Sequence, residues 1–316
     1  MKAIRFHQYG DAEVLRYEDA PVPVPGTGQV RVRVAATTFN GVDGNIRAGL
    51  MQGPMPLTLP HTPGLDVSGT VDAIGDEVSS LRIGDEVIGF LPFVVDGAAA
   101  EYVVADAETL ASAPTSIPLA DAAALPVVGL TAWQALFEHA GLRSGQRILV
   151  NGASGAVGGY AVQLAKATGA HVIATGGAGS REHLTARGAD EVIDHTTTDL
   201  STAAIEPVDV LLNLAPITPE QFSALSTLVA DGGVIVNTTV WMPAPSDEER
   251  GVRGIDLYVR SDADQLSELV ARVDRGELVV DVAERAALPD LASVHARAAA
   301  GQLSGKVVIV PAANDE

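Results

Sequence analysis

The sequence predicts an α/β protein in two parts, a β-rich domain and a doubly wound parallel sheet with helices on both faces. The chain has 316 residues, which fits two domains of roughly 100–200 residues each better than one core. Its first part contains short runs rich in valine and isoleucine that are separated by turn residues. From about residue 119 to residue 260, short apolar strands alternate with helical patterns, as in a parallel sheet.

The β-rich part begins at the N-terminus. We expect strands over residues 1–6, 29–36, 66–74, 86–91 and 102–104, with a turn segment rich in proline and glycine at 21–26. Many short strands with turn signals between them are typical of a small barrel-like β domain.

The expected parallel sheet has strands over 147–151, 171–175, 191–193, 209–214, 234–237 and 254–259, and helices over 156–168 and 180–187. Gly169 and Gly188 end these two helices. Beyond residue 260 the pattern predicts a helix at 262–274, a strand at 278–283, a helix at 291–300 and a closing strand at 306–310.

Composition excludes several classes of function. The formal charge is −20, from 40 acidic and 20 basic residues, and such a surface repels phosphate backbones and anionic lipid headgroups. We therefore expect no nucleic-acid partner and no membrane partner. The chain contains no cysteine, which excludes disulfides, thiolate catalysis and cysteine-ligated zinc. The first residues lack the apolar stretch of a signal peptide, which favours a cytoplasmic protein.

A glycine-rich turn between the strand at 147–151 and the helix at 156–168 matches the dinucleotide fingerprint G-x-G-x-x-G, with an alanine in the first glycine place. Gly155 leaves room for a pyrophosphate to approach the backbone, and Gly158 lets the helix pack closely on the sheet. Amides at the start of the helix then hold the phosphates. The residues assigned to this turn are Gly152, Ala153, Ser154, Gly155, Ala156, Val157 and Gly158.

The end of the second strand of the sheet selects the cofactor. NAD sites carry an acidic residue there that binds the ribose 2′-hydroxyl, whereas this chain has Gly176 and Gly177 followed by Ser180 and Arg181. An arginine binds phosphate through a bidentate fork, so we expect NADPH/NADP in preference to NAD. The alternative is that Ser180 only caps the next helix and Arg181 is solvated.

Several motifs together resemble the zinc-independent quinone oxidoreductases (zeta-crystallin-like) of the medium-chain dehydrogenases/reductases. They are residues 145–149 and 153–158 with Gln163 and Lys166, the turn at 63–69, the segment 129–133, the segment 188–194 and the closing 305–308. The resemblance implies a GroES-like catalytic domain built from residues 1–122 and 261–316, a Rossmann domain from residues 123–260, and a cleft where nicotinamide meets substrate. Zinc-dependent relatives place a cysteine near Asn40 and a histidine where Leu65 stands, so no catalytic or structural zinc is expected.

The resemblance also implies site residues. Asn40, Asp43 and Tyr258 are the candidate catalytic residues, with Asn40 bonding the acceptor carbonyl and Tyr258 or solvent supplying a proton. Thr131, His195, Asn213 and Trp241 are candidate cofactor contacts. Alternative interpretations remain: Asn40 and Asp43 are natural turn and cap residues, Tyr258 can be a core residue, and His195 can be a surface or packing residue.

The expected activity is metal-free hydride transfer from NADPH to a small-molecule electrophile, a quinone or another activated enone, because conjugation spreads the negative charge that develops. Two alternatives remain, an enoyl-thioester reductase and a non-catalytic NADPH-binding protein. Relatives pair their Rossmann sheets edge to edge, and an open edge strand is rarely left bare, so we expect a homodimer.

Overall fold

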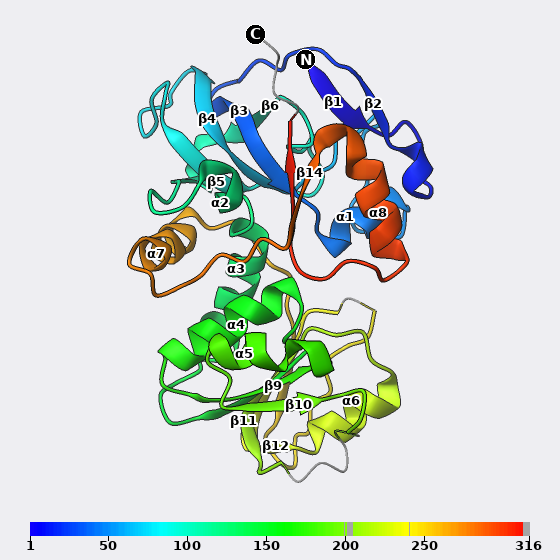
Figure 1. Cartoon of the computed structure of the whole chain (residues 1–316), viewed down its shortest axis with the longest axis vertical. Helices are drawn as coiled ribbons and strands as arrows, with labels where there is room; N and C mark the ends of the chain where they lie inside the picture. Colours follow the sequence, from blue (N-terminus) through cyan, green and yellow to red (C-terminus); the bar gives the residue numbers. More distant parts are fainter. Residues whose placement is uncertain (199, 201–204, 240, 312–316) are drawn as a thin grey trace. The chain divides into compact units, whose positions relative to one another are not determined.

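The computed structural model describes residues 1–198, 200, 205–239 and 241–311. The chain divides into two compact units (Figure 1), Met1–Val127 with Ser261–Glu316, and Val128–Arg260. The first boundary lies at the start of α3 (Pro126–Trp133), whereas the expected domain begins at residue 123. Two hydrogen bonds join Gln134, near the start of the second unit, to Arg260, its last residue. Gln134 Nε2 donates to Arg260 O at 2.9 Å, and Arg260 N donates to Gln134 Oε1 at 3.1 Å.

The second unit contains a six-stranded parallel sheet in the order β10-β9-β8-β11-β12-β13. Its strands are β8 (Arg147–Asn151), β9 (His171–Gly176), β10 (Glu191–Asp194), β11 (Val208–Asn213), β12 (Val229–Asn237) and β13 (Arg253–Asp256). The order reverses between β8 and β11, and this switch point is where ligands bind in open parallel sheets. The prediction of a doubly wound Rossmann sheet is confirmed.

Helices connect the strands of this sheet. α4 (Ala156–Ala167) packs on β8 and β9, α5 (Arg181–Ala186) packs on β10, and α6 (Pro219–Ser226) packs on β12. Because parallel crossovers are right-handed, the helices before and after the reversal of strand order cover opposite faces. The central strands are therefore buried on both sides, which is why Ile148, Leu149 and Val150 follow one another without a polar residue.

The first unit is built around a seven-stranded sheet in the order β14-β15-β3-β4-β5-β7, with β6 also paired to β3, and a separate hairpin of β1 and β2. The strands are β1 (Lys2–Arg5), β2 (Arg16–Asp19), β3 (Gln29–Thr38), β4 (Asp66–Ile74), β5 (Glu86–Phe90), β6 (Tyr102–Asp106), β7 (Leu110–Ser112), β14 (Glu284–Ala287) and β15 (Val307–Val310). Its helices include α1 (Gly41–Arg47), α2 (Leu119–Ala122), α7 (Ala263–Asp274) and α8 (Leu291–Ala299). Both ends of the chain contribute to this sheet, as expected of the GroES-like domain.

Apolar and charged residues alternate along β3, the strand that lies in the middle of the sheet of the first unit. Val30, Val32 and Val34 point into a buried apolar cluster with Val67 and Leu91, while Arg31 and Arg33 between them face the other side. Arg31 there forms a two-pronged ion pair with Asp72, at 2.8 and 3.0 Å.

The prediction of a strand at 278–283 is wrong, because the ladder between β14 and β15 begins only at Glu284. Val280 and Val282 still pack against the buried cluster of Ala36, Ala123, Ala124 and Val308. Their alternation therefore reflects partial burial of the side chains and not pairing in a β ladder. The strand predicted at 254–259 ends early, at Asp256, whose side chain is bonded to β12.

Candidate functional site

The glycine-rich turn joins the end of β8 to the start of α4 at the switch point of the sheet. Gly152 has φ +85°, in the left-handed region that favours glycine. Ala153, in the first glycine place of the motif, is fully buried and donates its backbone N–H to Thr175 O at 3.0 Å. The residue that makes the tight turn thus lies one position before the motif, which explains why alanine is tolerated at 153.

Gly155 and Gly158 lie in opposite environments. A Cβ at Gly155 would meet only Gly152 O, at 3.4 Å, and both Ser154 and Gly155 are exposed. A Cβ at Gly158 would lie 2.4 Å from Ala153 O and 2.5 Å from Ala153 Cα, because α4 packs directly on the turn there. The first N–H groups of α4, which begins with Ala156 and Val157, have no acceptor within the helix. An uncrowded glycine next to these amides is the arrangement that a pyrophosphate requires.

The segment after β9 carries the residues expected to select the cofactor. Gly176 ends the strand, and Ser180 Oγ donates to Gly177 O at 2.7 Å, so the serine hydroxyl closes this turn. Arg181, the first residue of α5, is exposed. The segment has no carboxylate before Glu182, as the sequence indicates.

One carboxylate does approach from the neighbouring strand. Asp194 ends β10, and hydrogen bonds from Thr196 hold its pKa below the ordinary value, with smaller contributions from the charges of His195 and Arg181. His195 is exposed. Arg181 and His195, both candidate cofactor contacts, therefore lie near the same half-buried carboxylate at the carboxyl end of the sheet.

Asn213 ends β11 and is fully buried. Its Oδ1 accepts from Asn151 Nδ2 at 2.8 Å, and its Nδ2 donates to Asn237 Oδ1 at 2.9 Å. The side chain of Asn213 is thus shielded from solvent and bonded on both sides, and the cofactor contact expected of this residue stays a prediction.

A cavity of about 220 Å³ lies within the second unit, beyond the ends of β12 and β13. Trp241 and Tyr258 both line it, together with Met242 and Leu257. Trp241 is 63% exposed and Tyr258 is 65% exposed, so Tyr258 is not a core residue. Thr131, the remaining cofactor candidate, lies in α3 and is 7% exposed.

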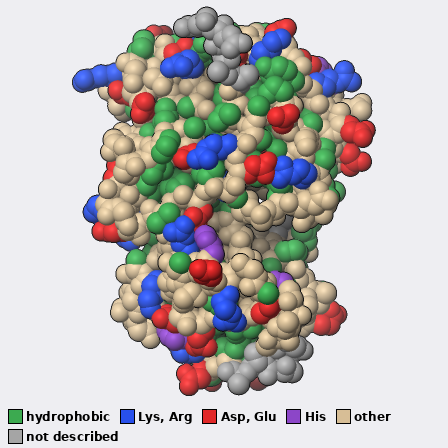
Figure 2. Space-filling model, viewed as in Figure 1, with side chains coloured by type: hydrophobic (Ala, Val, Ile, Leu, Met, Phe, Trp, Pro, Cys, Tyr) green, Lys and Arg blue, Asp and Glu red, His purple; other side chains and the backbone are tan. Residues whose placement is uncertain are grey.

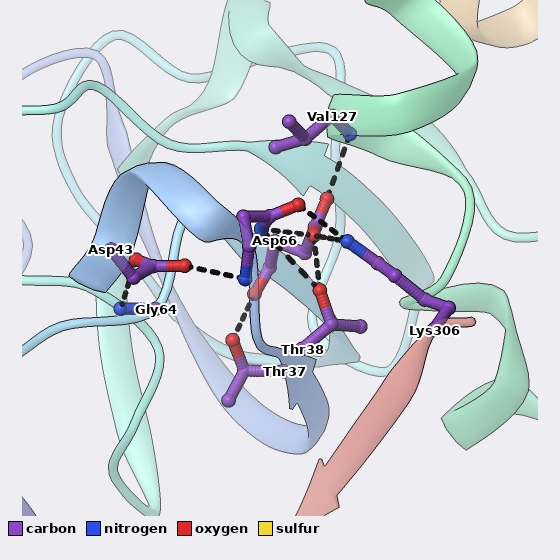
Figure 3. A network of polar contacts seen from close by, with 8 residues as sticks. Thr37, Thr38, Asp43, Gly64, Asp66, Val127 and Lys306 are labelled. Carbon is purple, nitrogen blue, oxygen red and sulfur yellow. Dashed lines mark hydrogen bonds and ion pairs between the residues drawn. The ribbon is translucent and has the colours of Figure 1, made fainter. Parts of the chain in front are cut away.

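The other catalytic candidates, Asn40 and Asp43, lie at the start of α1 in the first unit, and Asp43 is labelled in Figure 3. Asn40 is the N-cap of this helix, and Asp43 Oδ2 accepts from the Asn40 backbone N–H at 2.8 Å in a capping box. Asp43 Oδ1 accepts from Gly64 N at 3.4 Å. Burial raises the pKa of Asp43 to about 7, and the nearby charge of Asp66 adds to this rise. Asn40 and Asp43 thus take the cap positions that their residue types also predict.

A buried ion pair of Asp66 and Lys306 adjoins this cap (Figure 3). Asp66 begins β4, and its Oδ1 accepts from Val127 N at 2.7 Å. Its Oδ2 accepts from Lys306 Nζ at 3.1 Å and Asn40 Nδ2 at 2.9 Å, and also from the Thr38 hydroxyl. Lys306 also donates to Asn40 Oδ1. Such a pair is stable in the interior only because its polar atoms are hydrogen-bonded.

The residues around Asn40 do not fit a zinc ion. The Asn40 oxygen and the Asp66 carboxylate both face the ammonium of Lys306, so the positive charge at this place is already supplied by the chain. Leu65, beside Asp66, offers an aliphatic side chain. Among the residues that the structure describes, no group of three or more histidines and acidic residues is arranged to hold a metal ion.

Sequence reasoning missed the residues that organise these networks. Asp66 and Lys306 lie in two of the family motifs, the turn at 63–69 and the closing 305–308, but neither was given a role there. Asp66 begins β4, and Lys306 stands just before β15. Asn151 and Asn237 each end an apolar strand of the Rossmann sheet, as Asn213 does. An asparagine at the end of three apolar strands could have been recognised from the sequence as a cluster, because the ends of parallel strands meet at one edge of a sheet.

Comparisons with known proteins agree with this architecture. The family models that match are the alcohol dehydrogenase GroES-like domain, over residues 26–115, and the zinc-binding dehydrogenase domain, over residues 187–309. A chloroplast envelope quinone oxidoreductase homolog from Arabidopsis thaliana is 33% identical, over 98% of this chain and 98% of its own. A quinone oxidoreductase from Sus scrofa is 31% identical, over 96% of this chain and 97% of its own.

The chain belongs to the quinone oxidoreductase family. It is an oxidoreductase enzyme of the medium-chain dehydrogenases/reductases, and this family implies a nicotinamide cofactor. Among solved structures, the quinone oxidoreductase from Coxiella burnetii superposes with a TM-score of 0.89 at 28% identity, covering 98% of this chain and 99% of that one. The CurK enoyl reductase, at 24% identity and a TM-score of 0.85, shares the fold.

None of the helices in the described residues has the length and apolar character needed to cross a membrane. Acidic side chains are spread over the face shown in Figure 2 and are mixed with lysine and arginine.

Proposed function

We propose that this quinone oxidoreductase homologue transfers hydride from NADPH to a quinone or another activated enone, without a metal. The observation that carries this proposal is the turn at the end of β8, where a Cβ at Gly155, next to the first amides of α4, would make only one ordinary contact, with Gly152 O at 3.4 Å. Such a turn at the switch point of a doubly wound sheet is built to receive a dinucleotide pyrophosphate.

The residues present fit a nicotinamide dinucleotide. The backbone from Gly152 to Gly158 would hold the pyrophosphate, and the exposed segment after β9 would hold the adenosine ribose. When bound, the cofactor supplies a hydride to the acceptor. The protein's task is then to bind, orient and shield the two reacting rings.

The preference for NADPH rests on the charge of the segment after β9. No carboxylate of that segment precedes Glu182, whereas exposed Arg181 offers a guanidinium to a 2′-phosphate and the Ser180 hydroxyl lies beside it. We assign His195, at the end of the adjacent strand, to the same end of the cofactor.

The exposed rings of Trp241 and Tyr258 are the proposed contacts for the nicotinamide and the acceptor, since both line one cavity. The Tyr258 hydroxyl or solvent supplies the proton that completes reduction. Asn40 and Asp43 serve this reaction indirectly in our proposal, because their polar atoms are occupied by the helix cap and by the Lys306–Asp66 pair.

The activity is tested by following NADPH oxidation with 9,10-phenanthrenequinone, 1,4-benzoquinone and a crotonyl thioester. We expect turnover of the quinones and little turnover of the thioester. Turnover of the thioester alone would assign the chain to the enoyl-thioester reductases, and no turnover with any acceptor would favour a binding protein.

Cofactor selection is tested by comparing Arg181→Ala with Arg143→Ala. Both arginines are exposed in the second unit, but Arg143 precedes the start of β8 and so lies at the opposite edge of the sheet from the glycine turn. A charge-assisted contact to phosphate is worth about 1.5–3 kcal/mol, so Arg181→Ala should weaken NADPH binding about ten- to a hundredfold and leave NADH binding nearly unchanged. Arg143→Ala should change neither. Equal affinities of the parent protein for NADPH and NADH would reject the preference.

A further inference from the structure

A continuous row of side chains crosses the carboxyl edge of the Rossmann sheet. The strand register aligns Asn151 of β8 with Asn213 of β11, Asn213 with Asn237 of β12, and Asn237 with Asp256 of β13. On the other side of β8, Val150 is aligned with Ala174, which places Thr175 of β9 next to Asn151. Five neighbouring strands therefore each contribute one polar residue to the same row.

Hydrogen bonds join every neighbouring pair in this row. Thr175 Oγ1 donates to Asn151 Oδ1 at 2.9 Å, and Asn151 Nδ2 donates to Asn213 Oδ1 at 2.8 Å. Asn213 Nδ2 donates to Asn237 Oδ1 at 2.9 Å, and Asn237 Nδ2 donates to Asp256 Oδ1 at 3.0 Å. The first four residues are at most 4% exposed, so water does not compete for these bonds.

The direction of the row is fixed at Asn237. Its NH₂ group faces the Asp256 carboxylate and the backbone carbonyls of Thr239 and Met242, which only accept hydrogen bonds. Its Oδ1 accepts from Thr239 N at 3.2 Å and therefore also faces Asn213. The same requirement then orients Asn213 and Asn151. A flipped amide anywhere in the row would bring two donors or two acceptors together, so the row has one low-energy arrangement.

The two ends of the row are attached to the two parts of the proposed site. At one end, Thr175 Oγ1 accepts from Gly152 N at 2.9 Å, which fixes the first residue of the glycine turn. At the other end, Asn237 Nδ2 donates to Thr239 O at 2.9 Å and Met242 O at 2.8 Å, and both of these residues line the cavity that holds Trp241.

We infer that this row positions the cavity wall relative to the cofactor turn, with Asn213 as its central positioning residue. The effect expected on turnover rests on the proposed function, whereas the row of hydrogen bonds belongs to the protein without cofactor. When the turn is occupied, the row transmits the ordering of Gly152 to the wall that carries Trp241. If Asn213 is replaced by an apolar residue, the turn and the wall should each persist without this coupling.

The coupling can be measured on Trp241. The chain has 2 tryptophans, and Trp133→Phe leaves Trp241 as the only one. The probe ligand is 2′-phospho-ADP-ribose, which carries the phosphates but no nicotinamide and so does not absorb tryptophan emission. In the Trp133→Phe protein, its binding should reduce acrylamide quenching of Trp241. With Asn213→Leu added, the probe should still bind by calorimetry, but this reduction should be lost.

A matched control separates coupling from stability. Leu211 lies on the same strand and is fully buried but takes no part in the row. Leu211→Ala should lower thermal stability and retain the Trp241 response. If Asn213→Leu does not fold, Thr175→Val replaces it, because this isosteric change removes only the hydroxyl that links Asn151 to Gly152. No Trp241 response in the parent protein, or an unchanged response in the row variants, would overturn the inference.

Kinetics provide the second measurement. In Asn213→Leu, a misplaced cavity wall should lower kcat with the quinone about ten- to a hundredfold, while KM for NADPH changes less, because the hydrogen bond from Gly152 N to Thr175 stays in place. Unchanged kcat in the row variants would also reject the inference. If the parent protein turns over no acceptor, the proposed function fails, whereas the Trp241 measurement still decides the coupling.

Discussion

Two glycines of the phosphate turn, three residues apart, should respond in opposite ways to the same substitution. Gly155 has φ −78° and ψ 170°, an extended conformation that valine adopts readily, and a Cβ there would make one ordinary contact at 3.4 Å. Gly158 has no such room, since a Cβ would stand 2.4–2.6 Å from backbone atoms of Ala153.

The expected magnitudes follow from these distances. Gly155→Val restricts the unfolded chain, which stabilises by about 0.4–1 kcal/mol. It also places a poor N-cap residue on α4, which costs a similar amount. We therefore expect a change in unfolding free energy below about 1 kcal/mol. Its side chain fills the space of the pyrophosphate, so two or more charge-assisted hydrogen bonds are lost and NADPH binding should weaken at least about a hundredfold.

Gly158→Val should instead destabilise the fold. Closest approaches under 3 Å to backbone atoms cannot be relieved by a rotamer change, so α4 must move away from the turn. Overpacking of this kind costs about 1–3 kcal/mol or more. Denaturant unfolding and calorimetric NADPH titration of both valine variants, with Gly155→Ala and Gly158→Ala as graded controls, measure the two effects separately. Undiminished NADPH affinity in Gly155→Val would refute the assignment of this turn.

Three further predictions concern metal, pH and assembly. Dialysis against a chelator should leave quinone reduction unchanged, and elemental analysis that finds about one zinc per chain would contradict this. Burial raises the pKa of Asp43 from 3.8 to about 7, so the folded state binds that proton more tightly and stability should fall as pH rises from about 4 to about 7. Burial lowers the pKa of His295 from 6.5 to about 3, so stability should fall as pH drops below about 6.5. The two groups change the unfolding free energy in opposite directions over this pH range, so Asp43→Asn should leave only the effect of His295. Denaturant unfolding of this variant should then show a loss of about 2 kcal/mol in unfolding free energy between pH 7 and pH 5. An unfolding free energy that does not change with pH would reject this account. We also propose a homodimer through the edge strand β13, with twice the chain mass of 32.5 kDa by light scattering at micromolar concentration, and a monomer mass would exclude it.

Local pattern was sufficient to predict most of the Rossmann sheet. β8 and the start of α4 lie at their predicted residues, since a continuous apolar run, a glycine turn and an amphipathic helix leave few alternatives. The pattern failed at residues 278–283, where Val280 and Val282 alternate and are partly buried but belong to no strand. The periodicity of apolar residues indicates which side chains are buried. A β ladder also needs a neighbouring strand to pair with, and the local sequence does not specify that strand.

The residues of the candidate site also differ in how far the local sequence predicts them. The phosphate turn is contiguous in sequence and was predictable, whereas Lys306 and Asp66 are brought together although they lie 240 positions apart in the chain. No local signal pairs them, because a buried ion pair is specified by the packing of β4 against the strands around it. The row of asparagines is an intermediate case. Each member ends its strand, and parallel strands end at one edge, so the sequence predicts that polar side chains gather there. Their joining into one directed chain depends on the register of five strands and on the acceptors around Asn237, which are Asp256 and two backbone carbonyls, and only the structure provides these.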